Sequence, residues 1–174
     1  MKNPPIKSYH KVVEAYVSPD WFHHENKISD IGVVKIQGEF MSNNHPWIKP
    51  LRLPDLNSNY AGETAAVTGR GQNTLGVDAN GTLTKKTGAW DFKLRATVYK
   101  ILSDTTASRV PGDSGGPLVV DDNILVGVLS GGFNYQPGVP NIAYFVKVSH
   151  YVEFLQKIID GTYDRNSVVT KLYL

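Results

Sequence analysis

Short runs of apolar and β-branched residues, separated by turn signals, recur along most of this chain. Val12–Val17 is rich in strand-forming residues and ends at the turn signal Ser18-Pro19-Asp20. Ile31–Ile36 is a mostly apolar run, which is typical of a strand buried on both faces. Two further strands are predicted at Ala65–Thr68 and at the partly alternating segment Leu94–Leu102.

Two hairpins and one more strand complete the predicted β-structure. Asn80-Gly81 is a strong signal for a type I′ hairpin turn. The apolar runs Pro117–Val120 and Ile124–Leu129 predict a second hairpin, because three polar residues separate them. Tyr144–Val148 predicts a last strand.

One helix is predicted after these strands. Ser149 is a good N-cap, and apolar residues recur at helical spacing at Val152, Leu155 and Ile159. Gly161 is the residue expected just past the end of this helix. Many short strands followed by a terminal helix favour an all-β architecture, either an antiparallel barrel or a sandwich.

Length, charge and composition exclude several classes of protein. The chain has 174 residues, enough for one domain or for two small lobes that share an interface. Lys and Arg number 18 and Asp and Glu 16, and this net charge of +2 argues against a nucleic-acid partner. The apolar fraction of 41% is too high for a disordered chain. No apolar run approaches the ~18 residues that a membrane span requires, so no membrane partner is expected.

The chain contains no cysteine, which excludes disulfides, thiolate metal sites and cysteine nucleophiles. It also fits a reducing compartment. No cluster of His, Asp and Glu has metal-ligand spacing, so neither a metal nor another cofactor is expected. No hydrophobic signal-peptide core follows Met1, so either the protein is not exported by that route or Met1 is not the true start. The sequence leaves the compartment and the oligomeric state open.

The segment Gly112–Pro117, with the sequence Gly-Asp-Ser-Gly-Gly-Pro, is the most informative in the chain. It predicts a tight turn between two strands, with the hydroxyl of Ser114 at its centre. The flanking glycines allow positive φ and close approach of a substrate. The backbone N–H groups of Gly112 and Ser114 can point at one position, which would form an oxyanion hole for acyl transfer. An ordinary glycine-rich hairpin loop is the alternative interpretation.

This segment resembles the nucleophile motif of the trypsin/chymotrypsin-like serine proteases, and further landmarks follow in the order of that family. Ser29–Ile36 resembles the segment with the catalytic aspartate, and Pro50–Pro54 resembles the connection between the barrels. Val67–Gly71 resembles the Thr-Gly-Trp-Gly segment, with Arg70 in the tryptophan's place. Val126–Gly132 resembles the strand that pairs with substrate, and Phe145–Val148 resembles the segment before the terminal helix. The resemblance covers about residues 11–159. It implies a trypsin-like double antiparallel β-barrel with an incomplete N-terminal barrel in residues 1–54, a C-terminal barrel with its helix in residues 55–160, and a tail in residues 161–174.

The resemblance also assigns roles to residues of this chain. Ser114 would be the nucleophile, Asp30 would orient the base, and Gly112 and Ser114 would supply the oxyanion N–H groups. An extended peptide or protein substrate would pair with the backbone of Ser130, Gly131 and Gly132. One of its side chains would enter a pocket with Ser108 at the floor and Gly132 and Ala143 as walls. Ser108 at the pocket floor, in place of an aspartate, argues against a preference for Lys or Arg in the substrate.

The catalytic histidine of the family has no match in this chain. The five histidines are His10, His23, His24, His45 and His150. His23 and His24 are the nearest substitutes, because they fall in a loop before Asp30. The family's activation also frees a terminal ammonium that pairs with the aspartate before the nucleophile. Asp113 holds that position and would need another cation, such as Arg109.

Three hypotheses for function therefore remain. The chain is a fragment or mis-started copy of a serine endopeptidase that works through an acyl-enzyme, and it is weakly active or inactive as it stands. Alternatively, it is a non-catalytic protease homologue that serves as a peptide- or protein-binding module, or a scaffold that holds a peptide in the same cleft. Ser114, Asp30 and the glycines favour the first hypothesis, whereas the missing histidine and cysteines favour the others.

Overall fold

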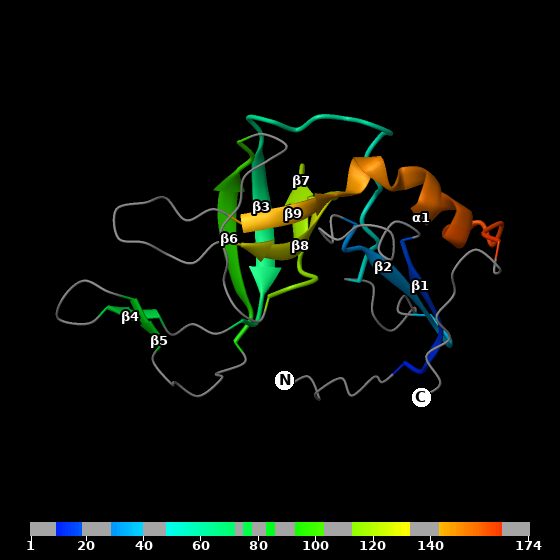
Figure 1. The fold of residues 1–174 in the computed structure, drawn as a ribbon, viewed down its shortest axis with the longest axis horizontal. Coiled ribbons are helices and arrows are strands. Elements are labelled where there is room, and N and C mark those ends of the chain that lie inside the picture. Colours follow the sequence, from blue (N-terminus) through cyan, green and yellow to red (C-terminus); the bar gives the residue numbers. More distant parts are fainter. Residues whose placement is uncertain are drawn as a thin grey trace, which may run out of the picture.

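The computed structural model describes residues 10–18, 29–39, 48–71, 75–77, 83–85, 93–102, 113–132 and 143–164. Within these residues all strand pairs in the sheets are antiparallel, and one α-helix lies towards the C-terminal end (Figure 1). The predicted all-β class with a C-terminal helix is therefore confirmed. Across the same residues, no helix is long and apolar enough to cross a lipid bilayer.

The largest sheet has five strands in the order β6-β3-β7-β8-β9. Its strands are β3 (Thr64–Gly69), β6 (Arg95–Lys100), β7 (Pro117–Val120), β8 (Ile124–Gly132) and β9 (Ala143–Lys147). Asp121 and Asp122 form the turn between β7 and β8 with φ of 48° and 59°, a left-handed conformation that Asp tolerates better than most residues. The predicted hairpin at this place is confirmed.

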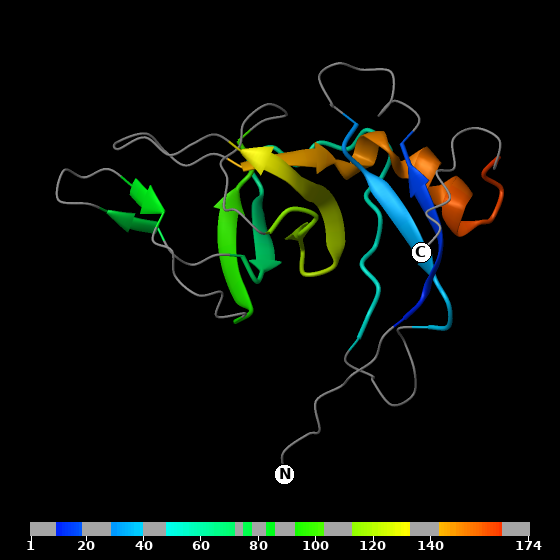
Figure 2. The same cartoon turned by 60° about the horizontal axis from the view of Figure 1, so that its bottom comes forward.

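The strands β1 (Val12–Val17) and β2 (Gly32–Ile36) form a separate two-stranded sheet, which Figure 2 shows beside α1 (Val152–Ile159). Both strands were predicted, but the expectation that the second is buried on both faces is wrong. Val34 is 61% exposed and Lys35 is also exposed. Val33 packs against buried side chains of the core, so one face of this narrow sheet is covered and the other faces solvent.

A third sheet consists of the short strands β4 (Leu75–Val77) and β5 (Leu83–Lys85). These two strands confirm that a hairpin forms here. Its predicted turn at Asn80-Gly81 lies outside the described residues.

Two groups of buried apolar side chains hold the sheets together. The first lies within the five-stranded sheet and comprises Ala65, Val67, Leu118, Val120 and Val126. The second joins β2 to β9 and α1 and comprises Ile31, Val146, Val148 and Leu155. Ile31 directly precedes β2, so the second group fixes the chain immediately after Asp30.

The C-terminal helix begins later than predicted. A 3₁₀ turn at Val148–His150 comes first, and α1 (Val152–Ile159) follows with Tyr151 at its N-cap. The predicted cap at Ser149 is wrong, because this side chain is buried in the 3₁₀ turn and its hydroxyl donates to the Ser58 carbonyl at 3.1 Å. The predicted stop is confirmed, since Gly161 has a φ of 70° and its N–H donates to the Ile158 carbonyl.

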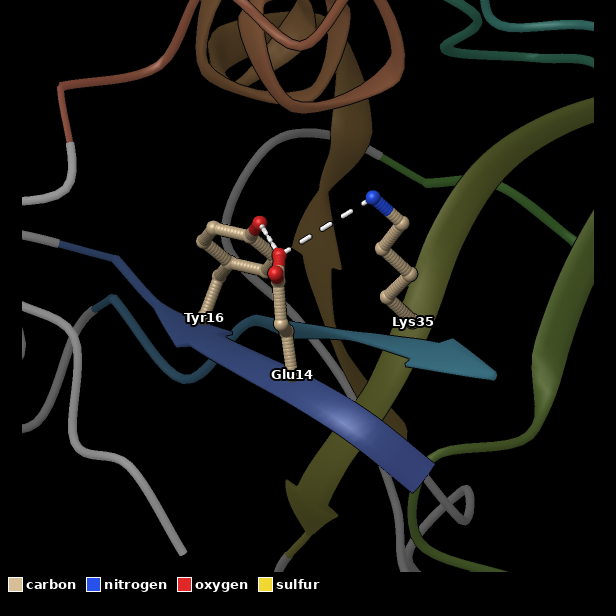
Figure 3. A network of polar contacts seen from close by, with 3 residues as sticks. All are labelled: Glu14, Tyr16 and Lys35. Carbon is tan, nitrogen blue, oxygen red and sulfur yellow. Dashed lines mark hydrogen bonds and ion pairs between the residues drawn. The ribbon is translucent and has the colours of Figure 1, made fainter. Parts of the chain in front are cut away.

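Polar and aromatic contacts fasten β1 to its neighbours. Figure 3 shows the Glu14 carboxylate between Tyr16, whose hydroxyl donates to it, and Lys35 on β2, whose Nζ is 4.0 Å away. The Tyr16 ring also packs edge to face on Tyr163, with 5.8 Å between centroids, and Tyr163 packs in the same way on Phe154 of α1. These rings join the residues after the helix to β1.

Candidate active site

The nucleophile candidate lies on a tight turn whose geometry depends on glycine. The Gly116 N–H donates to the Asp113 carbonyl at 2.9 Å, which closes a turn with Ser114 and Gly115 at its centre. Gly115 has a φ of 83°, as the third residue of a type II turn requires. Ser114 is exposed on this turn. The local sequence therefore places a hydroxyl at the surface, as the motif predicted.

Backbone hydrogen bonds attach this turn to β8. The Gly115 N–H donates to the Leu129 carbonyl at 2.8 Å, and the Leu129 N–H donates to the Gly116 carbonyl at 2.9 Å. Both bonds extend the β7–β8 pairing beyond Pro117, the first residue of β7. The position of Ser114 is thus set by the register of the central sheet.

The carboxylate candidate, Asp30, reaches the adjacent residue of β8. The Ser130 hydroxyl donates to Asp30 Oδ2 at 2.8 Å, although the two residues are 100 positions apart in the sequence. Asp30 is half-buried, and the buried Ile31 beside it packs in the second core group. The Tyr151 hydroxyl also contacts the Ser29 hydroxyl at 3.1 Å, which ties the segment before Asp30 to the residue that precedes α1.

The two candidates are therefore attached to consecutive residues of one strand, because Leu129 bonds the Ser114 turn and Ser130 bonds Asp30. The sequence identified Ser130 only through the expected substrate strand. It gave no indication that the Ser130 hydroxyl contacts Asp30. The one signal available was a hydroxyl residue near the end of the predicted strand that follows the nucleophile motif.

The predicted substrate strand is the last part of β8. Gly131 and Gly132 pair with Tyr144 and Ala143 of β9. The opposite neighbour, β7, pairs with β8 only as far as Val128. No atom lies within 4 Å of a Cβ placed on Gly131. In the described part of the structure, this end of β8 thus has one edge without a strand partner and open space beside it.

Several predicted site residues lie outside the described residues. They are Ser108, Arg109, Gly112, His23, His24 and His45. The pocket floor, one oxyanion N–H and the two favoured substitute histidines therefore stay predictions.

The two described histidines occupy other places. His10 Nδ1 is 3.4 Å from the Gln37 carbonyl, just beyond the Val12–Ile36 end of the β1–β2 pair. Asp30 lies beyond the opposite end, and a rise of about 3.3 Å per residue separates the two by roughly 20 Å. His150 is exposed in the 3₁₀ turn. The described residues contain no group of three His, Cys, Asp or Glu side chains that could hold a metal ion.

Antiparallel sheets, together with a serine turn and an aspartate that contact adjacent residues of one strand, are the arrangement expected of a chymotrypsin-like architecture. Residues 3–155 match the family described as Trypsin, and the chain belongs to this family.

Individual relatives agree with this assignment. A chymotrypsin of Phaedon cochleariae is 33% identical over 159 residues, covering 78% of this chain and 54% of the relative. A collagenase of Hypoderma lineatum is 30% identical over 158 residues, covering 83% of this chain and 59% of the relative. The chain thus spans little more than half the length of these relatives. Among solved structures, the scabies mite inactivated protease paralogue S-I1 shares the fold with a TM-score of 0.59 and 24% identity, over 86% of this chain and 68% of the other.

Proposed function

We propose that this chain carries the nucleophile and carboxylate of a serine endopeptidase site, which cleaves an extended peptide through an acyl-enzyme on Ser114. The observation that supports it best is the adjacency on β8. Leu129 holds the Ser114 turn through two backbone bonds, and the next residue, Ser130, donates to Asp30. An imidazole that bridges a serine and a carboxylate is the arrangement that activates a serine hydroxyl.

Each group then has a defined chemical role. A base removes the Ser114 proton as its oxygen attacks the scissile carbonyl, and the same base returns the proton to the leaving amine. Asp30 fixes the orientation of the imidazole and stabilises its protonated form. The backbone N–H groups of Gly112 and Ser114 stabilise the oxyanion. The free edge of β8 at Ser130–Gly132 binds the peptide as an added strand.

The source of the base decides how active the chain is by itself. It would come from His23 or His24, or from a histidine-bearing segment joined to this chain in a longer protein. Without a base the Ser114 hydroxyl stays protonated at neutral pH and reacts slowly. A serine protease that loses one member of its triad retains only about 10³–10⁴-fold catalysis over water, which comes from the oxyanion hole and substrate binding.

Labelling with a serine-directed fluorophosphonate tests this proposal. We expect weak labelling of the 174-residue chain by itself, and strong labelling once a histidine-bearing segment from a trypsin-family relative is fused before it. Ser114→Ala is the matched control and abolishes the signal, whereas Ser58→Ala, at a half-buried serine outside the site, is not expected to do so. Strong labelling of the unextended chain, lost in His23→Ala or His24→Ala, would assign the base to that residue. If the fusion with the histidine-bearing segment folds but is not labelled, the proposal is refuted.

A non-catalytic peptide-binding role is the second candidate. It is supported by the position of His10 at the far end of the β1–β2 pair, and by the inactivated protease paralogue among the structures that share the fold. A homologue of this kind would bind extended peptides at the edge of β8 without labelling at Ser114.

Peptide binding in a Gly132 variant tests this second role. Gly132→Trp places a large side chain at the end of β8 and is expected to abolish binding of an extended peptide, measured by fluorescence anisotropy. Lys100→Ala, on the distant edge strand β6, is the matched control and leaves binding unchanged. Equal binding by the Gly132 variant and the parent chain would count against the cleft in either role.

A further inference from the structure

The side chain of Asp113, which precedes Ser114, lies in a recess formed by two glycines. The Gly71 N–H donates to Asp113 Oδ1 at 2.5 Å. A Cβ placed on Gly69 would lie 2.1 Å from Oδ1, and a Cβ placed on Gly71 would lie 2.6 Å from Oδ2. Real Cβ atoms do not approach other atoms this closely, so the carboxylate occupies the space that side chains at both positions would fill.

Backbone conformation does not explain these two glycines. The described glycines with positive φ are Gly38, Gly62, Gly115 and Gly161, so Gly69 and Gly71 have a φ that other residues can adopt. What they provide is room for the Asp113 carboxylate and, at Gly71, an unobstructed N–H. The need for glycine at positions 69 and 71 therefore comes from Asp113, which is more than 40 residues away in the sequence.

We propose that residues 69–71 are a built-in latch for the Ser114 turn, and that this latch sets the turn without a free chain terminus. The Asp113 carboxylate accepts a hydrogen bond from the Gly71 N–H, and the Asp113 carbonyl accepts one from the Gly116 N–H. Both the side chain and the backbone of Asp113 are therefore fixed. Because Gly69 is the last residue of β3, the latch anchors the turn to the central sheet. In the family that this chain resembles, a terminal ammonium freed by activation cleavage pairs with the aspartate at this position. Here an internal N–H binds the same carboxylate.

The catalytic meaning of the latch rests on the proposed function, but the latch itself can be tested on the folded chain without any activity. We expect Gly71→Ala to lower the urea midpoint of unfolding, because its Cβ collides with the carboxylate. In an Asp113→Ala background the same substitution is expected to leave the midpoint unchanged or raise it, because Ala restricts the unfolded chain more than Gly does. Gly131→Ala is the matched control, since its Cβ meets no atom, and it does not lower the midpoint in either background. A loss of the same size for Gly71→Ala in both backgrounds would overturn the latch.

Independence from the terminus is tested by nuclear magnetic resonance on ¹⁵N-glycine-labelled protein. The Gly71 amide is expected to have the same chemical shift in the 174-residue chain and in a chain with Gly-Ser-Gly added before Met1. Asp113→Ala is expected to move it to lower proton frequency, because the hydrogen bond to a carboxylate is lost. If the added Gly-Ser-Gly moves the Gly71 amide resonance as far as Asp113→Ala does, the turn depends on the terminus and this part of the proposal is refuted. Failure of fluorophosphonate labelling would leave both of these readouts intact, so it would refute the proposed function and not the latch.

Discussion

Truncation of Ile31 tests whether the second core group positions Asp30. Ile31 is 7% exposed and packs with Val146, Val148 and Leu155, which lie on three different elements. Ile→Ala in a core costs about 2–5 kcal/mol and Ile→Val about 0.5–1.5 kcal/mol. Val148 is fully buried, so the surroundings of Ile31 have little freedom to close a cavity. We therefore expect a loss of about 3–4 kcal/mol for Ile31→Ala and about 1 kcal/mol for Ile31→Val.

Urea unfolding followed by far-ultraviolet circular dichroism measures these losses. With a slope of about 2 kcal/mol per molar urea, Ile31→Ala is expected to lower the midpoint by roughly 1.5–2 M. Val34→Ala is the matched control, because this apolar residue is on the same hairpin but is 61% exposed, and it is expected to change stability by less than about 0.5 kcal/mol. If Val34→Ala costs as much as Ile31→Ala, Ile31 does not anchor this segment and the argument for the position of Asp30 fails.

Two further variants probe single contacts. Ser130→Ala removes the donor to Asp30 Oδ2, and we expect a loss of about 1 kcal/mol in urea unfolding, together with weaker fluorophosphonate labelling of the histidine-bearing form; unchanged labelling would show that this hydrogen bond does not position Asp30. Gly127→Ala places a Cβ 2.9 Å from the Phe145 Cβ between neighbouring strands, and overpacking is expected to cost about 1–3 kcal/mol. A stability equal to that of the parent chain would mean that β9 can move away from β8.

Most secondary structure could be predicted because its signals are local. Val12–Val17 was predicted with the bounds that β1 has, and the hairpin of β7 and β8 follows from two apolar runs around a polar turn. Gly161 ends the helix because only its own φ matters there. The Ser114 turn was predictable for the same reason, since the sequence of four consecutive residues determines a type II turn.

Contacts between distant segments could not be predicted from these signals. Ser149 has the sequence context of an N-cap, yet its buried hydroxyl donates to the carbonyl of Ser58, and the helix begins after Tyr151. The apolar run at Ile31–Ile36 has the composition of a fully buried strand. Whether both of its faces are covered depends on which distant side chains pack against each face. Val33 packs against the second core group, whereas Val34 on the other face is 61% exposed.

The sequence by itself determined the family, the strand order along the chain and the serine turn, because each of these depends on neighbouring residues or on a contiguous motif. Only the tertiary structure decided which groups contact the turn and the carboxylate. Ser130 binds Asp30 across 100 residues, and Gly71 binds Asp113 across 42 residues. Both contacts are made by the register of β8 and the end of β3, and sheet register is set by the packing of the whole core, which no short segment of sequence encodes.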